Sequence, residues 1–153
     1  MRNLNYTTAD IEGGYDPGKE IMDVMAIPQA DNLFDVVICI HVLQHVQDDA
    51  KAMREIFRVL KPGGWAILNS RMDSTMETTL EMSKVSLSED QRKAMHANEL
   101  YRVYGQDLKL RLESAGFAVN GDRYLASLDE KTIEKCFLRT AGEVYLCKKC
   151  DGR

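Results

Sequence analysis

The hydrophobic residues of the N-terminal half fall into short runs that predict β-strands. Residues 34–40, FDVVICI, form an almost continuous apolar run, which is typical of a strand buried on both faces of a parallel sheet. Residues 4–11, LNYTTADI, alternate loosely and are rich in β-branched and aromatic types, and residues 19–24, KEIMDV, predict a shorter strand. Residues 65–70, WAILNS, predict a fourth strand.

A helical spacing of apolar residues lies between the strands predicted at 34–40 and 65–70. Within residues 47–64 the large apolar residues recur at i, i+3, i+4 and i+7: Met53, Ile56, Phe57 and Leu60. That spacing places them on one face of a helix. Asp48 or Asp49 can cap its first turn, and Pro62-Gly63-Gly64 ends it. Strand, helix and strand with short connections predict a right-handed parallel crossover.

The C-terminal half continues this alternation. Residues 106–116 predict a second amphipathic helix, and residues 117–128 predict a strand in which Asn120-Gly121 forms a turn or bulge. A short helix over 129–138 and a last strand over 143–149 follow. Alternating helices and buried strands predict a three-layer α/β fold.

Residues 71–100 interrupt the alternation with a long polar stretch that contains several methionines. The segment Ser88–Gln91 matches a capping box, so we expect a helix to begin there. A long excursion after a strand is typical of a lid or a substrate-facing insertion. An ordinary helical cover of the sheet explains the pattern equally well, because methionines fill irregular gaps.

Composition and charge indicate one globular domain over residues 1–153. Apolar residues make up 44% and charged residues 29%, with a formal net charge of -4. The sequence has no Lys/Arg-dense block, which disfavours a nucleic-acid partner. No apolar run has the length of a membrane span, and the first residues lack the apolar core of a signal peptide. We therefore expect a cytoplasmic protein without a membrane partner.

Two features could indicate metal chemistry, and we interpret neither in that way. Cys147 and Cys150 form a lone CKKC at the end of the last predicted strand, without the second pair of ligands that zinc commonly needs. His41 and His45 are four residues apart, but Val42 stands where the HExxH pattern requires glutamate. We expect His41 to face a ligand and His45 to pack or to lie on a helix surface.

Three stretches together resemble the class I S-adenosylmethionine-dependent methyltransferases of the type 11-like group. They are MDVMAIPQADNLFDVVICIHVLQHV at 22–46, AMREIFRVLKPGGWAIL at 52–68 and YGQDLKLRLESAGFAV at 104–119. The resemblance extends over residues 4–149 and implies a Rossmann-like methyltransferase fold. It also implies S-adenosylmethionine as the cofactor and a small molecule as the methyl acceptor.

The resemblance implies roles for residues at the ends of the predicted strands, where open α/β sheets bind their ligands. Asp10 is implied to hold the ribose, and Asp23 to face the adenine amino group, with the amide of Val24 beside the ring. Ile40 and His41 are implied to open toward the cofactor. A solvated turn acid is the alternative interpretation for either aspartate.

The chain departs from the family pattern in one respect. The glycine-rich turn of the family should precede Asp10 by about 20 to 30 residues, but only nine residues precede it and no G-x-G occurs. We therefore expect a fold truncated at the N-terminus, without the central strand between 4–11 and 35–40. That loss would leave two strand edges exposed or newly paired.

Two functions remain open at this point. The first is methyl transfer, with His41 as a candidate base and Arg71 as a candidate for orienting an acidic substrate. The second is a non-catalytic protein or subunit that needs a partner chain to complete the cofactor site, with a homodimer through the open sheet edge as the favoured assembly. A nicotinamide dehydrogenase is less favoured, since it would also need the glycine turn.

Overall fold

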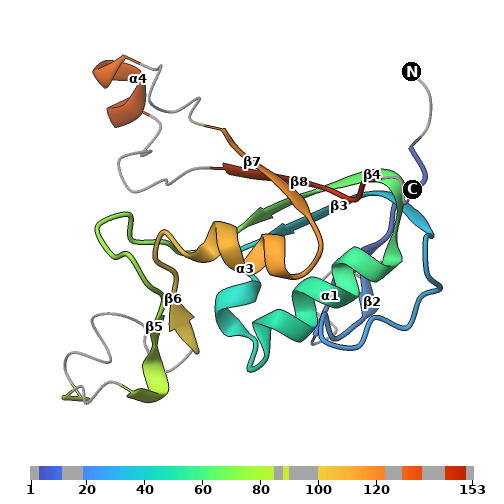
Figure 1. Ribbon diagram of the computed structural model, residues 1–153, viewed down its shortest axis with the longest axis horizontal. Coiled ribbons are helices and arrows are strands. Elements are labelled where there is room, and N and C mark those ends of the chain that lie inside the picture. Colours follow the sequence, from blue (N-terminus) through green and yellow to red (C-terminus); the bar gives the residue numbers. More distant parts are fainter. Residues whose placement is uncertain are drawn as a thin grey trace.

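The largest sheet has four strands in the order β3-β4-β8-β7 (Figure 1). In this computed structural model the described residues are 4–11, 19–84, 88–89, 100–122, 129–135 and 144–150. The strands are β3 (Phe34–Ile40), β4 (Leu60–Asn69), β8 (Val144–Lys148) and β7 (Ala118–Asp122). β3 and β4 are parallel, as predicted, and β8 runs antiparallel to β4 and β7. The predicted α/β class is confirmed.

Helix α1 (Asp49–Val59) begins as the sequence predicts but ends earlier. The Asp48 carboxylate caps it by accepting a hydrogen bond from the Lys51 amide at 2.9 Å. The chain is already extended at Leu60, so KPGG belongs to β4 and not to the helix end. A Cβ on Gly64 would lie 2.9 Å from the Asp35 carbonyl oxygen, so glycine allows β4 to approach β3 closely.

Helix α3 (Leu108–Ser114) is followed by Gly116, the residue predicted to stop it, where the backbone has a φ of 109°. The strand β7 that follows it differs from the prediction. Asn120 and Gly121 form neither a turn nor a bulge, because they pair in regular register with Leu146 and Tyr145 of β8. The short helix α4 (Glu130–Lys135) confirms its prediction within the part of it that is described.

The two faces of the four-stranded sheet have different surroundings. Helices α1 and α3 lie on the same face (Figure 1). They bury the side chains that point toward them, which include Cys39, Ala66, Leu68, Tyr145 and Cys147. Alternate residues on the same strands are exposed on the opposite face: Val36, Ile38, Ile40, Trp65 and Leu146.

Strands β1 (Thr8–Asp10) and β2 (Lys19–Ile21) form a separate parallel pair. The strand predicted over 4–11 is therefore wrong in its first half, because residues 4–7 pair with no strand in the described part of the chain. β1 does not pair with β3, whose only strand partner in the described sheet is β4. An open edge on β3 agrees with the expectation from the sequence.

Part of the excursion at 71–100 contributes to a separate two-stranded sheet. β5 (Leu80–Glu81) pairs antiparallel with β6 (Arg102–Val103), and the short 3-10 helix η2 (Met82–Lys84) follows β5. The helix expected to begin at Ser88 falls almost entirely outside the described residues, and a lid at 71–100 stays a prediction. None of the described helices has the length and apolar character to cross a membrane.

Candidate functional site

Four of the predicted site residues lie at or just after the carboxyl ends of parallel strands. Asp10 is the last residue of β1, and Asp23 follows β2 by two residues. His41 comes directly after β3, and Arg71 comes two residues after β4. Since the carboxyl ends of parallel strands meet at one sheet edge, four separate segments contribute polar side chains there.

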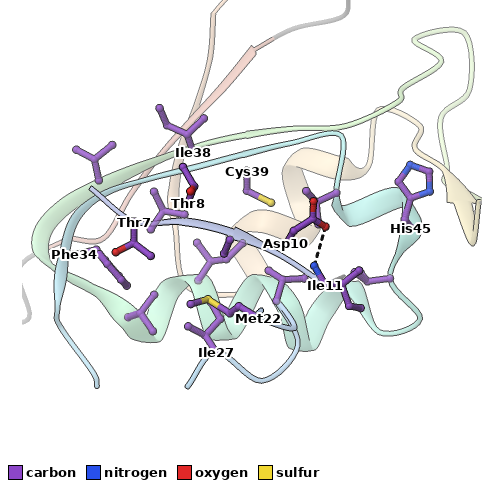
Figure 2. A pocket seen from close by; sticks show the side chains of 18 residues that line it. Thr7, Thr8, Asp10, Ile11, Met22, Ile27, Phe34, Ile38, Cys39 and His45 are labelled. Atoms are coloured by element: carbon purple, nitrogen blue, oxygen red, sulfur yellow. Dashed lines mark hydrogen bonds between the residues drawn. The ribbon is translucent and has the colours of Figure 1, made fainter. Parts of the chain in front are cut away.

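A cavity of about 430 Å³ separates β1 from β3, and we call it the β1–β3 slot. Thr7 and Phe34 lie at one end of it, and Ile11 and His45 lie at the other (Figure 2). β1 and β3 therefore run in the same direction along the slot. Its lining is mostly apolar, with Ile56 and Val59 of α1 contributing from below.

Two of the predicted cofactor residues line this slot, and three do not. Asp10 and Val24 are lining residues, whereas Asp23, Ile40 and His41 lie outside the lining. Asp10 is half-buried, and its Oδ1 accepts a hydrogen bond from the Ile11 amide at 2.8 Å (Figure 2). Its carboxylate is thus held in place at the carboxyl end of the slot.

The Asp23 side chain organises the loop that follows β2. Its Oδ1 accepts a hydrogen bond from the Met25 amide at 2.8 Å, and its carbonyl oxygen accepts one from the Ala26 amide at 2.9 Å. This pair of hydrogen bonds forms a tight turn that presents Val24 to the slot. The alternative of a turn-forming acid therefore describes part of what Asp23 does.

Arg58 on α1 fixes the next part of this loop. Its guanidinium donates to the carbonyl oxygens of Ile27 and Gln29, each at 2.8 Å, and to Asp31 at 2.7 Å. Arg58 also donates to Glu55, whose carboxylate accepts from the Ile27 amide at 3.0 Å. The Arg58 hydrogen bond lowers the pKa of Glu55 below its ordinary value.

The turn after β3 separates the two histidines that the sequence analysis compared. His41 has a left-handed backbone with a φ of 57°, and its amide donates to the Asn69 carbonyl oxygen at 2.8 Å. The 3-10 helix η1 (Leu43–His45) follows, so His41 and His45 do not share an α-helical face. The structure places His45, rather than His41, on the slot. No periodic pattern in the sequence indicates this turn.

Gln44 is a second residue that sequence reasoning missed. It is buried, and its Oε1 accepts hydrogen bonds from the Ser70 hydroxyl at 2.7 Å and from the Arg71 amide. Its side-chain nitrogen lies 3.2 Å from Nε2 of His45. Gln44 therefore connects the end of β4 with the histidine at the slot.

The slot also contains a thiol that is poorly suited to act as a nucleophile. Cys39 is buried, and burial raises its pKa to about 12. Cys147 is buried in the same core, and its pKa is likewise raised to about 12 by burial. Within the described part of the chain, no three His, Cys, Asp or Glu side chains gather as metal ligands would.

Comparison with known proteins finds partial sequence matches to methyltransferases. Residues 11–68 match the family model described as a methyltransferase domain. Over 62 residues the chain is 44% identical to the ubiquinone/menaquinone biosynthesis C-methyltransferase UbiE of Pasteurella multocida, a match that covers 40% of this chain and 18% of UbiE. Over 76 residues it is 32% identical to norajmaline N-methyltransferase of Rauvolfia serpentina, covering 50% of this chain and 25% of that protein.

A solved structure extends the likeness to most of the fold. The S-adenosylmethionine-dependent methyltransferase of Mesorhizobium loti superposes with a TM-score of 0.61 and 16% identity, over 91% of this chain and 76% of that one. The fold is thus a Rossmann-like α/β fold. The partial sequence matches and this fold are those of class I S-adenosylmethionine-dependent methyltransferases. Its matches span about a fifth to a quarter of the length of the two curated relatives.

Proposed function

We propose that the chain binds the adenosyl part of S-adenosylmethionine at the carboxyl edge and takes part in methyl transfer to a small acceptor. The observation that carries this proposal is the placement of Asp10 at the carboxyl end of the slot, with the Asp23 turn on the neighbouring strand. Two carboxylates held by backbone amides suit the hydroxyl and amino groups of a nucleoside.

The residues fit the adenosine part of the cofactor. Asp10 is proposed to accept hydrogen bonds from the ribose, and Asp23 from the adenine amino group, with Val24 beside the ring. Ile40 and His41 are proposed to border the bound nucleoside at the end of β3. Among the described residues we assign none to the methionine part of the cofactor.

When bound, the cofactor supplies an electrophilic methyl group for in-line displacement, and the acceptor loses a proton if it carries one. The role of this chain is to hold the two reactants in line, which is the main contribution a protein makes to such a transfer. His41 stays the proposed base, and Arg71 the proposed residue for orienting an acidic acceptor. The relatives are named for methylation of different acceptor atoms, carbon and nitrogen, so they leave the acceptor open.

Calorimetric titration of the protein with S-adenosylmethionine and with adenosine tests this proposal. We expect weak binding of both, with adenosine retaining much of the affinity. Asp10→Asn and Asp23→Asn should each weaken binding, because asparagine keeps the oxygen that the backbone amide needs but loses the charge. Asp35→Asn is the matched control, since Asp35 is an exposed acid that pairs with Lys61 at the opposite end of β3.

Two results would contradict the proposal. Adenosine binding that is equal in the wild type and in both site variants would remove Asp10 and Asp23 from the site. No binding of either ligand, in a protein that melts cooperatively, would favour the second function: a subunit that needs a partner chain to complete its site. The open β1–β3 slot is the observation that supports this alternative.

The cytoplasm is the proposed location, consistent with free thiols at Cys39, Cys147 and Cys150.

A further inference from the structure

The turn η1 brings His45 to the carboxyl end of the β1–β3 slot (Figure 2). Its backbone is held by β6 and by the residue before β6. The Tyr101 amide donates to the Gln44 carbonyl oxygen at 2.8 Å, and Arg102 donates to the Val46 carbonyl oxygen at 2.6 Å. Because the backbone is fixed on both sides of His45, the side-chain partners of its ring decide what the ring presents to the slot.

The side-chain amide of Gln44 is held in one orientation. Its Oε1 accepts hydrogen bonds from the Arg71 amide and from the Ser70 hydroxyl at 2.7 Å. A backbone amide only donates, so the atom facing it must be the oxygen of the glutamine side chain. The other end of the amide is then the NH2 group, 3.2 Å from Nε2 of His45. Reversing the amide would place this NH2 group against the Arg71 amide.

This orientation decides which nitrogen of the neutral His45 ring carries the proton. An amide NH2 group only donates, so Nε2 must accept, and the ring proton lies on Nδ1. His45 therefore presents an N–H donor at Nδ1, while the lone pair of Nε2 is engaged by Gln44. A ring held in this way is suited to orient a ligand rather than to accept its proton. The role proposed for His41, that of a base, is a different one.

Asp10 supplies the complementary group at the same end of the slot (Figure 2). An ionised carboxylate only accepts hydrogen bonds, whereas Nδ1–H of His45 donates one. A ribose hydroxyl fits both groups, because it donates its proton to Asp10 and accepts from His45. The carboxylate in the methionine part of the cofactor fits His45 alone, because it has no proton to donate.

We propose that His45 is a ligand-binding residue of this site, which donates a hydrogen bond from Nδ1 to an oxygen atom of the bound ligand. Gln44 is the positioning residue that fixes the tautomer of His45. This inference rests on the proposed function, which places the ligand at the carboxyl end of the slot, and it adds a contact that the proposed function does not contain. The oxygen belongs either to a ribose hydroxyl or to the methionine carboxylate, and the titrations below separate these two sources.

Nitrogen-15 NMR of the histidine rings tests the positioning without any ligand. We expect the neutral His45 ring of the wild type to carry its proton on Nδ1, and His45→Asn assigns the signals by removing them. Gln44→Glu keeps the oxygen that accepts from Ser70 and Arg71 but replaces the NH2 group with a second acceptor. Nε2 of His45 should therefore gain a proton in this variant. A proton on Nε2 in the wild type, or no change in Gln44→Glu, would overturn the role of Gln44.

Titrations with adenosine and with S-adenosylmethionine test the donor role. His45→Leu should weaken binding about 3- to 10-fold, the ratio that one hydrogen bond ordinarily contributes. His45→Asn should retain most of the affinity, because its amide nitrogen lies as many bonds from Cα as Nδ1 does. Gln47→Leu is the matched control, since Gln47 is exposed on the same turn and does not line the slot. Equal losses for both ligands assign the oxygen to the ribose, and a loss for S-adenosylmethionine alone assigns it to the methionine carboxylate.

Three results would overturn the donor role. The first is unchanged affinity for both ligands in His45→Leu; if Asp10→Asn still weakens binding, the proposed function then stands without this contact. The second is an equal loss in His45→Leu and His45→Asn, which would replace the Nδ1 contact with a packing role. The third is a wild type that binds neither ligand, which would overturn the proposed function as well. In that case the NMR measurement would still decide the role of Gln44 by itself.

Discussion

Replacing Arg102 with methionine should destabilise the protein strongly. Arg102 is 3% exposed, and its guanidinium is surrounded by backbone carbonyl groups of the turn after β3. Nη1 donates to the carbonyl oxygens of Leu43 at 3.0 Å and Val46 at 2.6 Å, and Nη2 donates to that of Gln47 at 2.9 Å. One side chain from β6 thus holds the turn that places a histidine on the slot.

The cost of Arg102→Met can be estimated contact by contact. Gln47 is exposed, so water replaces its lost donor. The Leu43 carbonyl oxygen keeps a contact with the Tyr104 hydroxyl at 3.3 Å, although that hydroxyl also donates to Asp49 at 2.9 Å. The buried Val46 carbonyl oxygen loses its guanidinium donor, which costs about 1–3 kcal/mol. Loss of the ion pairs with buried Asp49 at 3.7 Å and half-buried Glu81 at 3.2 Å adds to this. The total is about 2–4 kcal/mol of the 5–15 kcal/mol typical of a domain.

Urea unfolding followed by circular dichroism measures this loss at neutral pH. Lys109→Met is the control, since its 3.9 Å pair with Glu113 is exposed and should contribute less than about 0.5 kcal/mol. Hydrogen exchange adds a local readout: the Tyr101 amide, which donates to the Gln44 carbonyl oxygen at 2.8 Å, should lose protection in Arg102→Met. Equal unfolding free energies for the two variants would refute this account of the network.

Two further changes have clear expected outcomes. Gly105→Ala should destabilise by about 1–3 kcal/mol in thermal unfolding, because a Cβ there would lie 2.7 Å from the Thr78 carbonyl oxygen; an unchanged midpoint would contradict the tight approach. Glu55 has a lowered pKa through its hydrogen bond from Arg58, so its contribution is present above its ordinary value of 4.5 and is lost as the pH falls below it. Between pH 6 and pH 3 the wild type should therefore lose more thermal stability than Glu55→Gln, and equal losses would count against the pairing.

The elements that could be predicted from the sequence are those that local chemistry determines. The cap at Asp48 and the burial of Met53 and Ile56 follow from residue types at helical spacing, and they are confirmed. Of the other two residues predicted on that face, Phe57 is half-buried and Leu60 belongs to β4. The strand at 34–40 follows from an apolar run, but its expected burial on both faces is wrong, because Val36, Ile38 and Ile40 are exposed. The carboxyl-edge location of Asp10 and Asp23 follows once strands are assigned, because strand ends fix which edge a residue occupies.

The features that sequence reasoning missed depend on contacts between distant segments. An arginine such as Arg102 would ordinarily be expected on the surface, and its burial depends on carbonyl groups about 55 residues away. The placement of His45 on the slot depends on the left-handed backbone of His41, which no side-chain pattern signals. Residues 4–7 have strand-like composition but pair with none of the described strands. Strand formation depends on cross-strand neighbours more than on intrinsic propensity.

The two sides of the candidate site are supported unequally, and this connects cofactor binding to assembly. The turn after β3 is held by Arg102 and Gln44. Asp10, in contrast, belongs to a strand that pairs only with β2 among the described strands. The position of Asp10 relative to β3 is therefore set by whatever closes the β1–β3 slot. If a strand from a second copy closes it, a nucleoside that needs both sides binds better to the dimer. By thermodynamic reciprocity, the nucleoside then strengthens the dimer by the same factor.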